Sequence, residues 1–341
     1  MKYKHIGQPS DQPNDSQSKL DDSLSRRNFL RNSSTASVGA GLIVTSKTAL
    51  GQEGPDKGKK VRCGIVGYGD EGKALRESSM FLKDLVCFPA VSDIWPRNLR
   101  AGKGQISASK QGGGADGSEC NAYADPKAMI EKEDLDCIIV ATPDFSHHTY
   151  SIMGLEKGLD VYCEKLMSNS IDYARQMVQA QKETGKLLAI GHQRRSNPRY
   201  LHVKNEILGK RQLLGWITHM TAQWNRSRGG SVPREIPMGK DALDDETLKE
   251  FGFNGGAKGM FEFRNWRMYK KFGGGIISDL GAHQIDIFNW LLDEYPKSIF
   301  AQGGTDYYTG EFLNNLLTSE VKEAMEKTKS RKRKAKLEEE L

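Results

Sequence analysis

Residues 61–72 read VRCGIVGYGDEG, a short apolar run that ends in glycines. Gly67, Gly69 and Gly72 form the pattern G-x-G-x-x-G directly after an expected strand and at the start of an expected helix. A Cβ atom at these positions would block the tight turn and the close approach of a diphosphate to the helix N-terminus, whose free N–H groups bind anions. The stretch therefore predicts a dinucleotide-binding strand–turn–helix unit; a glycine turn without a ligand is the alternative.

The next apolar run, CFPAVSDIW (87–95), carries a carboxylate at its end. Asp93 stands about 20 residues after the third glycine, where a carboxylate accepts hydrogen bonds from the adenosine ribose. A carboxylate there repels a 2′-phosphate, so the sequence favours NAD over NADP. Arg97, four residues on, keeps NADP as the minority interpretation.

Short apolar runs alternate with helical segments up to residue 190. The runs LDCIIVATP (135–143), LDVYCEKL (159–166) and KLLAIGHQ (186–193) predict three further strands, with a helix between each pair. This alternation is typical of a parallel sheet with helices on both faces. We therefore expect an α/β Rossmann domain over residues 61–190, with ligands at the carboxyl ends of its strands.

The pattern changes beyond residue 190. The segment GWITHMTAQWN (215–225) alternates like a half-exposed strand, and residues 231–250 form a long polar excursion with prolines. We expect an α+β substrate domain over residues 191–310 and a charged helical tail over residues 311–341. The part of the excursion from Asp241 to Glu250 has no role that the sequence assigns.

The composition is that of a soluble globular protein with two domains. The chain has 341 residues, 37% of them hydrophobic and 28% charged, and no apolar run is long enough to span a bilayer. The net charge of +6 is smaller than the seven basic residues of KTKSRKRKAK (327–336). No aromatic residue interleaves with that run, so a solvated helix or tail is favoured over a nucleic-acid-binding surface.

The N-terminal region resembles an export signal. Residues 25–31 read SRRNFLR, and the small and apolar residues TASVGAGLIVT (35–45) follow. Twin arginines before a modest apolar region are typical of the twin-arginine route; a short basic amphipathic helix is the alternative. We expect a signal over residues 1–50, a linker over residues 51–60, and a periplasmic or other extracytoplasmic protein that is exported folded.

The cysteines predict thiols of the core. They are five, an odd number, and three of them lie in apolar strand-like runs. We therefore expect buried thiols and no disulfide framework. The five are Cys63, Cys87, Cys120, Cys137 and Cys163.

Three titratable groups follow a glycine run in GGGIISDLGAHQID (273–286). On a helix at roughly 100° per residue, Asp279, His283 and Asp286 share a face, and Ile277 lies on the opposite, packed face. Asp279 and His283 are four residues apart, so a hydrogen bond between them would orient the imidazole and raise its basicity. An amphipathic helix with a solvated polar face is the alternative. Without a second histidine at metal spacing, we expect no metal.

These motifs together resemble the Gfo/Idh/MocA family of glucose–fructose oxidoreductases, inositol dehydrogenases and rhizopine catabolism proteins. The matching pieces, spread in the family's order over residues 61–307, are GIVGYGDEG, ATPDFSH, GLDVYCEKL, GHQRRSNP, NWRMYKKFGGG and DLGAHQID. The resemblance implies a Rossmann domain followed by a domain with a large, mostly antiparallel sheet, whose outer face often forms homo-oligomers. After residue 310 the chain departs from the family pattern, so the second domain is expected to be shortened.

The resemblance also implies residue roles. Lys165 corresponds to the lysine of the family's E-K-P motif, with Leu166 in place of the proline, and Asp279 and His283 correspond to the catalytic pair. Chemistry agrees with these roles, because oxidising a secondary alcohol requires a base for the hydroxyl proton and a cation beside the developing alkoxide. The other cofactor contacts are assigned to Thr142, Pro143, His147 and Glu164. The substrate side is assigned to Arg194, Arg195, Trp266, Arg267 and Asp286, with core and rim packing as the alternative for Trp266 and Arg267.

Three functions fit these features. The first is an oxidoreductase that transfers a hydride between NAD, bound tightly before export, and a hydroxyl carbon of a sugar or cyclitol. The second is a glycoside-cleaving enzyme that uses NAD for transient oxidation and elimination. The third is an exported sugar-binding protein without catalysis, which the replaced proline and the altered C-terminal region favour.

Overall fold

The computed structural model describes residues 60–109, 119–225, 234, 236 and 239–304. The chain divides into two compact units, Met1–Asp293 and Glu294–Leu341, and the elements below all belong to the first. The expected signal at residues 1–50 and the expected tail at residues 311–341 lie outside the described residues. Within the described part of the chain, no helix combines the length and the apolar composition that crossing a membrane requires.

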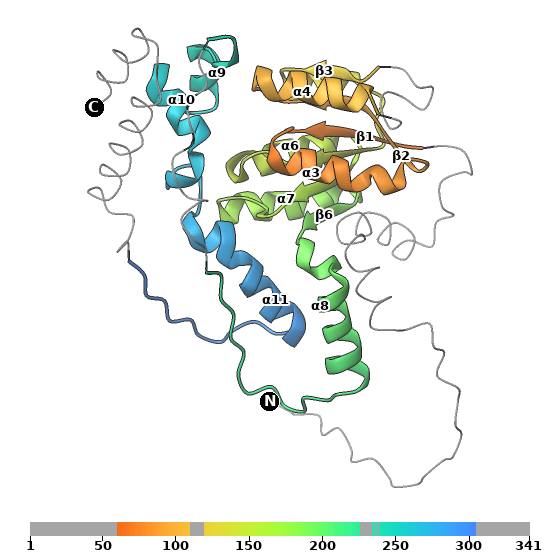
Figure 1. Cartoon of the computed structure of the whole chain (residues 1–341), viewed down its shortest axis with the longest axis vertical. Helices are drawn as coiled ribbons and strands as arrows, with labels where there is room; N and C mark the ends of the chain where they lie inside the picture. Colours follow the sequence, from red (N-terminus) through yellow and green to blue (C-terminus); the bar gives the residue numbers. More distant parts are fainter. Residues whose placement is uncertain (1–59, 110–118, 226–233, 235, 237–238, 305–341) are drawn as a thin grey trace, which may run out of the picture. The chain divides into compact units, whose positions relative to one another are not determined.

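A six-stranded parallel sheet forms the first half of this unit, in the order β3-β2-β1-β4-β5-β6 (Figure 1). β1 and β4 are central, and their inner residues are almost completely buried, which is typical of parallel strands covered on both faces. The parallel sheet expected from the apolar runs is confirmed. The strands are β1 Val61–Val66, β2 Val86–Ser92, β3 Asn121–Tyr123, β4 Cys137–Val140, β5 Asp160–Glu164 and β6 Leu188–Gly191.

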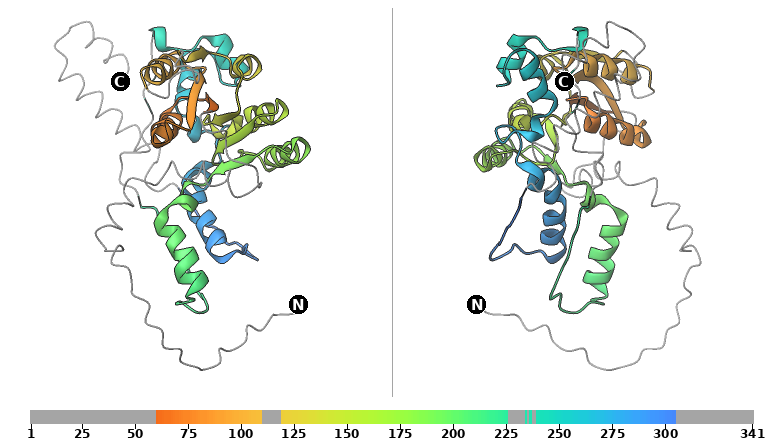
Figure 2. Two further views of the ribbon diagram at one scale, coloured as in Figure 1. Left: turned by 90° about the vertical axis from the view of Figure 1, so that its right-hand side faces the viewer. Right: turned by 60° about the vertical axis from the view of Figure 1, so that its left-hand side comes forward.

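Helices lie against the sheet (Figure 2). They pack on it through two separate apolar clusters. One cluster joins the sheet to α5 (Pro126–Lys132), α6 (His147–Glu156) and α7 (Ile171–Thr184). The other joins it to α3 (Asp70–Ser78) and α4 (Pro96–Ser107). The sequence pattern predicted α3, α6 and α7 but neither α4, α5 nor the short strand β3.

The described residues after Gly191 contain helices and irregular chain but no strand. The strand predicted over residues 215–225 is therefore wrong for the part of the chain that the structure describes: Trp216 is 92% exposed, and no described segment pairs with it. A strand needs a neighbour for its backbone hydrogen bonds. The helices are η3 Gln193–Ser196, α8 Pro198–His202, η4 Val203–Lys210, η6 Gly239–Asp241, α9 Asp245–Glu250, α10 Gly256–Arg264, η7 Trp266–Met268, η8 Ile277–Gly281 and α11 Ala282–Leu292.

The excursion without a predicted role packs on the Rossmann domain. Trp95, which follows β2, lies in one apolar cluster with residues of α9, α10 and η7, including Leu248, Met260 and Trp266. The indole Nε1 of Trp95 donates a hydrogen bond to the main-chain oxygen of Asp241 at 2.6 Å, and Arg100 pairs with the Asp241 carboxylate. Residues 239–268 are thereby fixed beside the end of β2, where Asp93 stands.

Two of the five cysteines depart from the prediction of buried thiols. Cys63 and Cys137 face each other in β1 and β4, with Cα atoms 4.9 Å apart, and form a disulfide. The physical reason is register, since parallel pairing places these two residues opposite each other although 74 positions separate them. Cys87, Cys120 and Cys163 are buried thiols, as predicted.

Candidate active site

A cleft of about 670 Å³ follows the carboxyl ends of the strands. One wall consists of residues that follow β1, β2, β4 and β5, among them Gly67, Asp93, Thr142 and Lys165. The opposite wall comes from α10, η7, η8 and α11, and includes His283. The volume lies in the range of pockets that hold cofactors and small ligands.

The glycine turn has the geometry that a dinucleotide diphosphate requires. Gly67 has φ +90°, and a Cβ there would lie 2.8 Å from the main-chain oxygen of Ala141. A Cβ at Gly72 would lie 2.0 Å from the main-chain oxygen of Gly67, so this glycine permits the close packing of α3 on the turn. Gly69 lines the cleft, and a Cβ there would have only Asn98 Nδ2 nearby, at 4.0 Å. The open space beside Gly69 fits the approach of a diphosphate to the N-terminus of α3.

Asp93 lies in the cleft wall at the predicted position. Its carboxylate accepts hydrogen bonds from the main-chain N–H groups of Tyr68 (2.7 Å) and Trp95 (2.8 Å) and from Asn98 Nδ2 (3.1 Å). Burial raises its pKa to about 6, against the effect of these hydrogen bonds. Each carboxylate oxygen has two lone pairs, so acceptor capacity remains for ribose hydroxyls.

Two arginines pack on the indole ring of Trp95. The guanidinium carbon of Arg97 lies 5.6 Å from the ring centroid, and that of Arg264 lies 4.5 Å away. Arg97, assigned to the cofactor from sequence, does not line the cleft, whereas Arg264 does. Arg264 was not predicted from the sequence, because only the docking of α10 brings it to Trp95.

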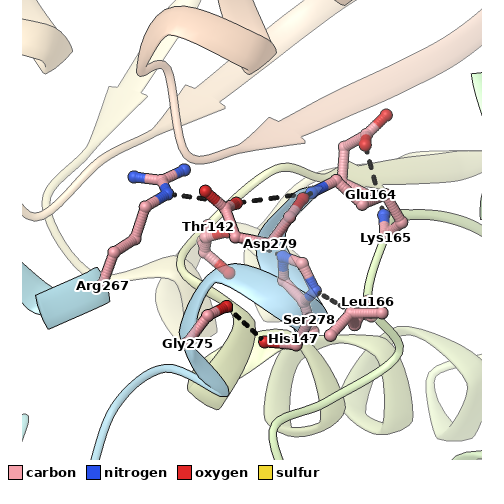
Figure 3. Close-up of polar contacts among 9 residues, drawn as sticks. All are labelled: Thr142, His147, Glu164, Lys165, Leu166, Arg267, Gly275, Ser278 and Asp279. Carbon is pink, nitrogen blue, oxygen red and sulfur yellow. Dashed lines mark hydrogen bonds and ion pairs between the residues drawn. The ribbon is translucent and has the colours of Figure 1, made fainter. Parts of the chain in front are cut away.

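Lys165, at the end of β5, points across the cleft (Figure 3). Its Nζ donates to the main-chain oxygen of Asp279 at 2.5 Å and lies 3.4 Å from Asp279 Oδ1. The side chain is only 14% exposed. The Lys165–Leu166 peptide bond is cis. Lys165 lines the cleft with Leu166 in the place of the proline of the resembled motif.

His147 lies behind the cleft lining rather than in it. It is 1% exposed, with Nδ1 2.5 Å from the main-chain oxygen of Leu166 and Nε2 2.7 Å from that of Thr142 (Figure 3). Burial lowers its pKa. The ring connects the segment after β4 with the segment after β5, while Thr142 and Pro143 themselves line the cleft.

Asp279 forms its ion pairs with Lys165 and Arg267, not with His283. Arg267 Nε lies 3.3 Å from Asp279 Oδ1, and the Arg267 guanidinium also packs on the ring of Trp266 at 4.2 Å. The structure describes both Asp279 and His283, and the hydrogen bond predicted between them is not formed. The reason is η8, a π-helical turn with i→i+5 bonds, which shifts the helical phase between the two residues. The same shift leaves Ile277 66% exposed, where packing was predicted.

His283 is the buried imidazole of the cleft. It is 6% exposed and stacks on Trp224, with ring centroids 5.5 Å apart. Burial is the main cause that lowers its pKa to about 4, and the charge of Lys165 acts in the same direction. His283 is therefore neutral at pH 7 and able to accept a proton. Arg194, which also lies near it, packs over the ring of Trp224 at 4.7 Å.

Two residues assigned to the substrate, Arg195 and Asp286, pair with each other instead. Arg195 Nη2 lies 2.5 Å from Asp286 Oδ1, Arg195 Nε lies 3.0 Å from Oδ2, and His192 Nδ1 lies 3.5 Å from Oδ1. Neither Arg195 nor Asp286 lines the cleft. The pair connects η3 (Gln193–Ser196) to α11. Of the other substrate assignments, Trp266 and Arg267 line the cleft and Arg194 does not.

Two buried carboxyl groups stand next to Lys165. Glu164 accepts hydrogen bonds from Tyr162 Oη (3.1 Å) and the Lys165 N–H (3.2 Å), and burial followed by the charge of Glu71 raises its pKa to about 7. Burial raises the pKa of Asp144 to about 6, with Lys165 opposing. Asp144 was not among the predicted site residues, although its position directly after Thr142 and Pro143, which follow β4, was a signal for it.

The cleft thus combines a nucleotide-type turn, a neutral imidazole and a lysine amine. Such a set can bind a dinucleotide, take a proton from a hydroxyl group and stabilise the negative charge left on its oxygen. Within the described ranges, no group of three or more histidine, cysteine, aspartate or glutamate side chains is arranged to hold a metal ion.

Comparison with known proteins adds the family. A family model described as the oxidoreductase family with NAD-binding Rossmann fold (GFO/IDH/MocA) matches residues 61–192, and the model of the GFO/IDH/MocA C-terminal domain matches residues 248–325. These two models together match more than half of the chain.

The individual relatives share less than a third of their residues with this chain over the aligned region. The myo-inositol 2-dehydrogenase of Thermotoga maritima is 24% identical over 247 residues, which cover 71% of this chain and 58% of that protein. An inositol 2-dehydrogenase of Klebsiella pneumoniae is 30% identical over 149 residues, 43% of this chain and 41% of that protein. The solved WlbA dehydrogenase of Bordetella pertussis, in complex with NADH and UDP-GlcNAcA, has a TM-score of 0.48 and 20% identity, over 70% of this chain and 59% of that one. The chain spans less than two thirds of the length of each of them.

Proposed function

Because the chain belongs to the Gfo/Idh/MocA family of oxidoreductases, we propose that it oxidises or reduces a hydroxyl carbon of a sugar, a cyclitol or a derivative, with a nicotinamide dinucleotide as cofactor. One observation carries this proposal: Lys165, from the sheet, and His283, from α11, line the same cleft as the glycine turn. Two side chains of the required chemistry thus meet beside the cofactor position although 118 positions separate them in the sequence.

The residues divide the reaction between them. His283, neutral at pH 7, takes the hydroxyl proton on a ring nitrogen during oxidation and returns it during reduction. Lys165 Nζ, held by the main-chain oxygen of Asp279, has further N–H groups that stabilise the developing alkoxide. Bound nicotinamide supplies the hydride acceptor for oxidation and, in its reduced form, the donor for reduction. Asp279 acts as a positioning residue for the amine rather than for the imidazole.

NAD is the proposed cofactor, with NADP as the minority alternative. Asp93 in the cleft wall accepts hydrogen bonds and disfavours a 2′-phosphate, whereas Arg264 and Arg97 near Trp95 support the alternative. Tight binding is also proposed, because residues 239–268 pack against Trp95 at the Asp93 end of the cleft.

A sugar or cyclitol is the proposed substrate class. Trp224 and Trp266 supply aromatic surface to the cleft, and Arg267 and Gln193 supply hydrogen-bond donors at the same end as His283. Aromatic faces combined with a few polar groups are suited to a ring that carries hydroxyls on apolar carbons. The names of the inositol dehydrogenase relatives agree with this class.

Export and assembly belong to the same proposal. The residues SRRNFLR at 25–31 support the twin-arginine route, and the disulfide between Cys63 and Cys137 suits an oxidising compartment. Replacing both Arg26 and Arg27 with lysine should leave the protein in the cytoplasm, as measured by cell fractionation. Export of that variant at the normal level would reject the route. A homo-oligomer is proposed from the family resemblance.

The function is tested by first identifying the nucleotide and then following the reaction. Denatured protein is expected to release NAD, and sugars or cyclitols should produce or remove the reduced-nicotinamide absorbance. Lys165→Met should lower this rate by about 10²–10³-fold while NADH still binds. A sugar hydrolysed without net redox change would favour glycoside cleavage instead. Protein that neither releases nor binds a dinucleotide would overturn the proposal and favour a sugar-binding role.

A further inference from the structure

The glycine turn carries an unfavourable charge for a diphosphate. Asp70 and Glu71 occupy the first turn of α3 between the second and third glycines, and both line the cleft. A carboxylate a few ångströms from a phosphate repels it, because the Coulomb energy between like charges rises as their distance falls. The N–H groups and the dipole of α3 attract the diphosphate, but they act against two negative charges at the same end. The turn alone therefore lacks a positive side chain.

Arg234, from the second half of the chain, reaches this turn. Its Nη1 lies 3.1 Å from Asp70 Oδ2, and both residues line the cleft. Because 164 positions separate the two residues, nothing local in the sequence indicates this pair.

The backbone of Arg234 is fixed by a buried side chain. Asn265 Oδ1 accepts a hydrogen bond from the Arg234 N–H at 2.6 Å, and Asn265 Nδ2 donates to the Arg234 main-chain oxygen at 3.2 Å. Asn265 is buried, and its Nδ2 also donates to the main-chain oxygen of Phe261 at 3.0 Å, at the end of α10. A side chain on a backbone held in this way is directed to the turn before any ligand arrives, which lowers the entropy lost on binding.

Arg264 adds to the positive charge on the same side. It lines the cleft over Trp95, and burial lowers its pKa, with further lowering by Arg234 and Arg97 and an opposite effect of Asp70. The charges of Arg234 and Asp70 are therefore close enough to act on Arg264. Arg234 and Arg264 thus line the cleft that the acidic turn also lines, and a diphosphate between them and the turn would separate the opposing charges.

We propose that Arg234 is a cofactor-binding residue: Asn265 holds its backbone so that the guanidinium lies over the glycine turn, where it pairs with Asp70 and contacts the diphosphate of the dinucleotide. A guanidinium has five N–H donors, so one can stay on Asp70 while others bind phosphate oxygens. This inference rests on the proposed function, because it takes a dinucleotide as the ligand of the cleft.

A purely structural role for the pair makes the opposite prediction for Asp70. If the ion pair only ties residue 234 to α3, then loss of either partner loosens the cleft and weakens binding in the same way. If Arg234 binds the diphosphate, Asp70→Asn removes a repulsive charge and releases the guanidinium, so binding becomes tighter. The sign of the Asp70→Asn effect therefore separates the two.

Isothermal titration calorimetry of the full-length chain with NADH, ADP and adenosine tests the proposal without reference to turnover. Arg234→Ala should weaken the binding of NADH and ADP by about 10- to 100-fold, the usual effect of losing a charged hydrogen bond. Adenosine, which has no phosphate, should bind within about 2-fold of the wild type. Arg234→Lys should fall between the two, since lysine keeps the charge but not the forked geometry.

Matched controls separate binding from folding. Arg175→Ala removes an arginine from an exposed pair with Asp172 on α7, away from the cleft, and should leave NADH affinity unchanged. Thermal unfolding without nucleotide should give Arg234→Ala and Arg175→Ala similar midpoints. Asp70→Asn serves as the second test if Arg234→Ala does not fold, and should tighten NADH binding by about 2- to 10-fold.

Each result decides the proposal. Weaker NADH and ADP binding in Arg234→Ala with tighter binding in Asp70→Asn supports it. Unchanged NADH affinity in Arg234→Ala, equal weakening of adenosine, or weakening by Asp70→Asn overturns it while the proposed function stands. A wild-type chain that binds adenosine but neither NADH nor ADP overturns both.

Discussion

The two walls of the cleft are built in different ways. The sheet wall depends on the backbone, since the glycine turn and the ends of the strands leave no space for a Cβ at Gly67 or Gly72. The helical wall depends on side-chain charges, as in the pairs of Asp279 with Lys165 and Arg267. Steric exclusion does not change with pH or salt, whereas ion pairs do. The glycine turn of the sheet wall is therefore fixed by sterics, whereas the arrangement of the helical wall depends on ion pairs that pH and salt can change.

The largest expected effect concerns the imidazole of the helical wall. His283→Gln should lower the oxidation rate by about 10²–10⁴-fold, the usual contribution of a positioned base, with NADH binding unchanged. Because the pKa of His283 is lowered to about 4, the wild-type imidazole stays neutral as pH falls from 7 to 5. We therefore expect the ratio of the wild-type rate to the His283→Gln rate to stay constant over this range and to decline below it. A His283-dependent decline centred near pH 6.5 would contradict this assignment.

The next effect tests whether sterics alone fix the sheet wall. Gly72→Ala places a Cβ 2.0 Å from the main-chain oxygen of Gly67 and should cost about 2–4 kcal/mol of unfolding free energy, measured by urea denaturation. Gly69→Ala is the matched control within the same motif, because its Cβ meets only Asn98 Nδ2 at 4.0 Å. This control should fold normally and weaken NADH binding. Equal stability of the two variants would remove the distinction between the walls.

The third prediction concerns Glu164, a titratable group of the sheet wall. The folded-state pKa of Glu164 is raised to about 7 from 4.5, so the folded protein binds more protons than the unfolded chain between these values. Stability from this group is therefore lost as pH rises through that window. At pH 8 the free energy of unfolding of Glu164→Gln should exceed that of the wild type by about 1–3 kcal/mol. Below pH 4.5 this difference should disappear.

The exposed Glu156→Gln, at the end of α6, is the control for this change. It should show no such pH dependence. A Glu164→Gln variant that is less stable than the wild type at pH 8 would mean that the carboxylate's hydrogen bonds outweigh its burial.

The smallest effect concerns the pair behind the helical wall. Asp286→Asn should cost about 1 kcal/mol, because Arg195 is partly exposed and screened by solvent. The matched variant Asp293→Asn breaks the more exposed pair with Lys204 and should cost less. A raised KM in Asp286→Asn at unchanged stability would restore the sequence assignment of this residue to the substrate.

The sequence predicted most of the sheet wall because its signals are local. Gly67, Gly69 and Gly72 stand within six residues, and each of the longer strands is mostly apolar. The strand β3 escaped prediction because three residues, two of them exposed, have no period. The disulfide between Cys63 and Cys137 escaped because it depends on register between strands.

The helical wall was predicted by residue type but not by geometry. Asp279 and His283 line the cleft as expected, yet a π-turn between them changed the partner of the aspartate. The contacts of Trp95 with Asp241 and of Arg234 with Asp70 join residues 146 and 164 positions apart. Side-chain contacts over such distances follow from the docking of whole segments, which no periodicity encodes.

Three of the five tryptophans, Trp95, Trp224 and Trp266, line the cleft, and they come from both of its walls. Indole emission overlaps the absorption of reduced nicotinamide, so energy transfer should quench the intrinsic fluorescence when NADH binds. With NADH bound as proposed, the protein carries its own optical reporter of cofactor occupancy, with Trp95 next to Asp93 and Trp224 stacked on His283. Removing one ring at a time would show which end of the dinucleotide leaves first.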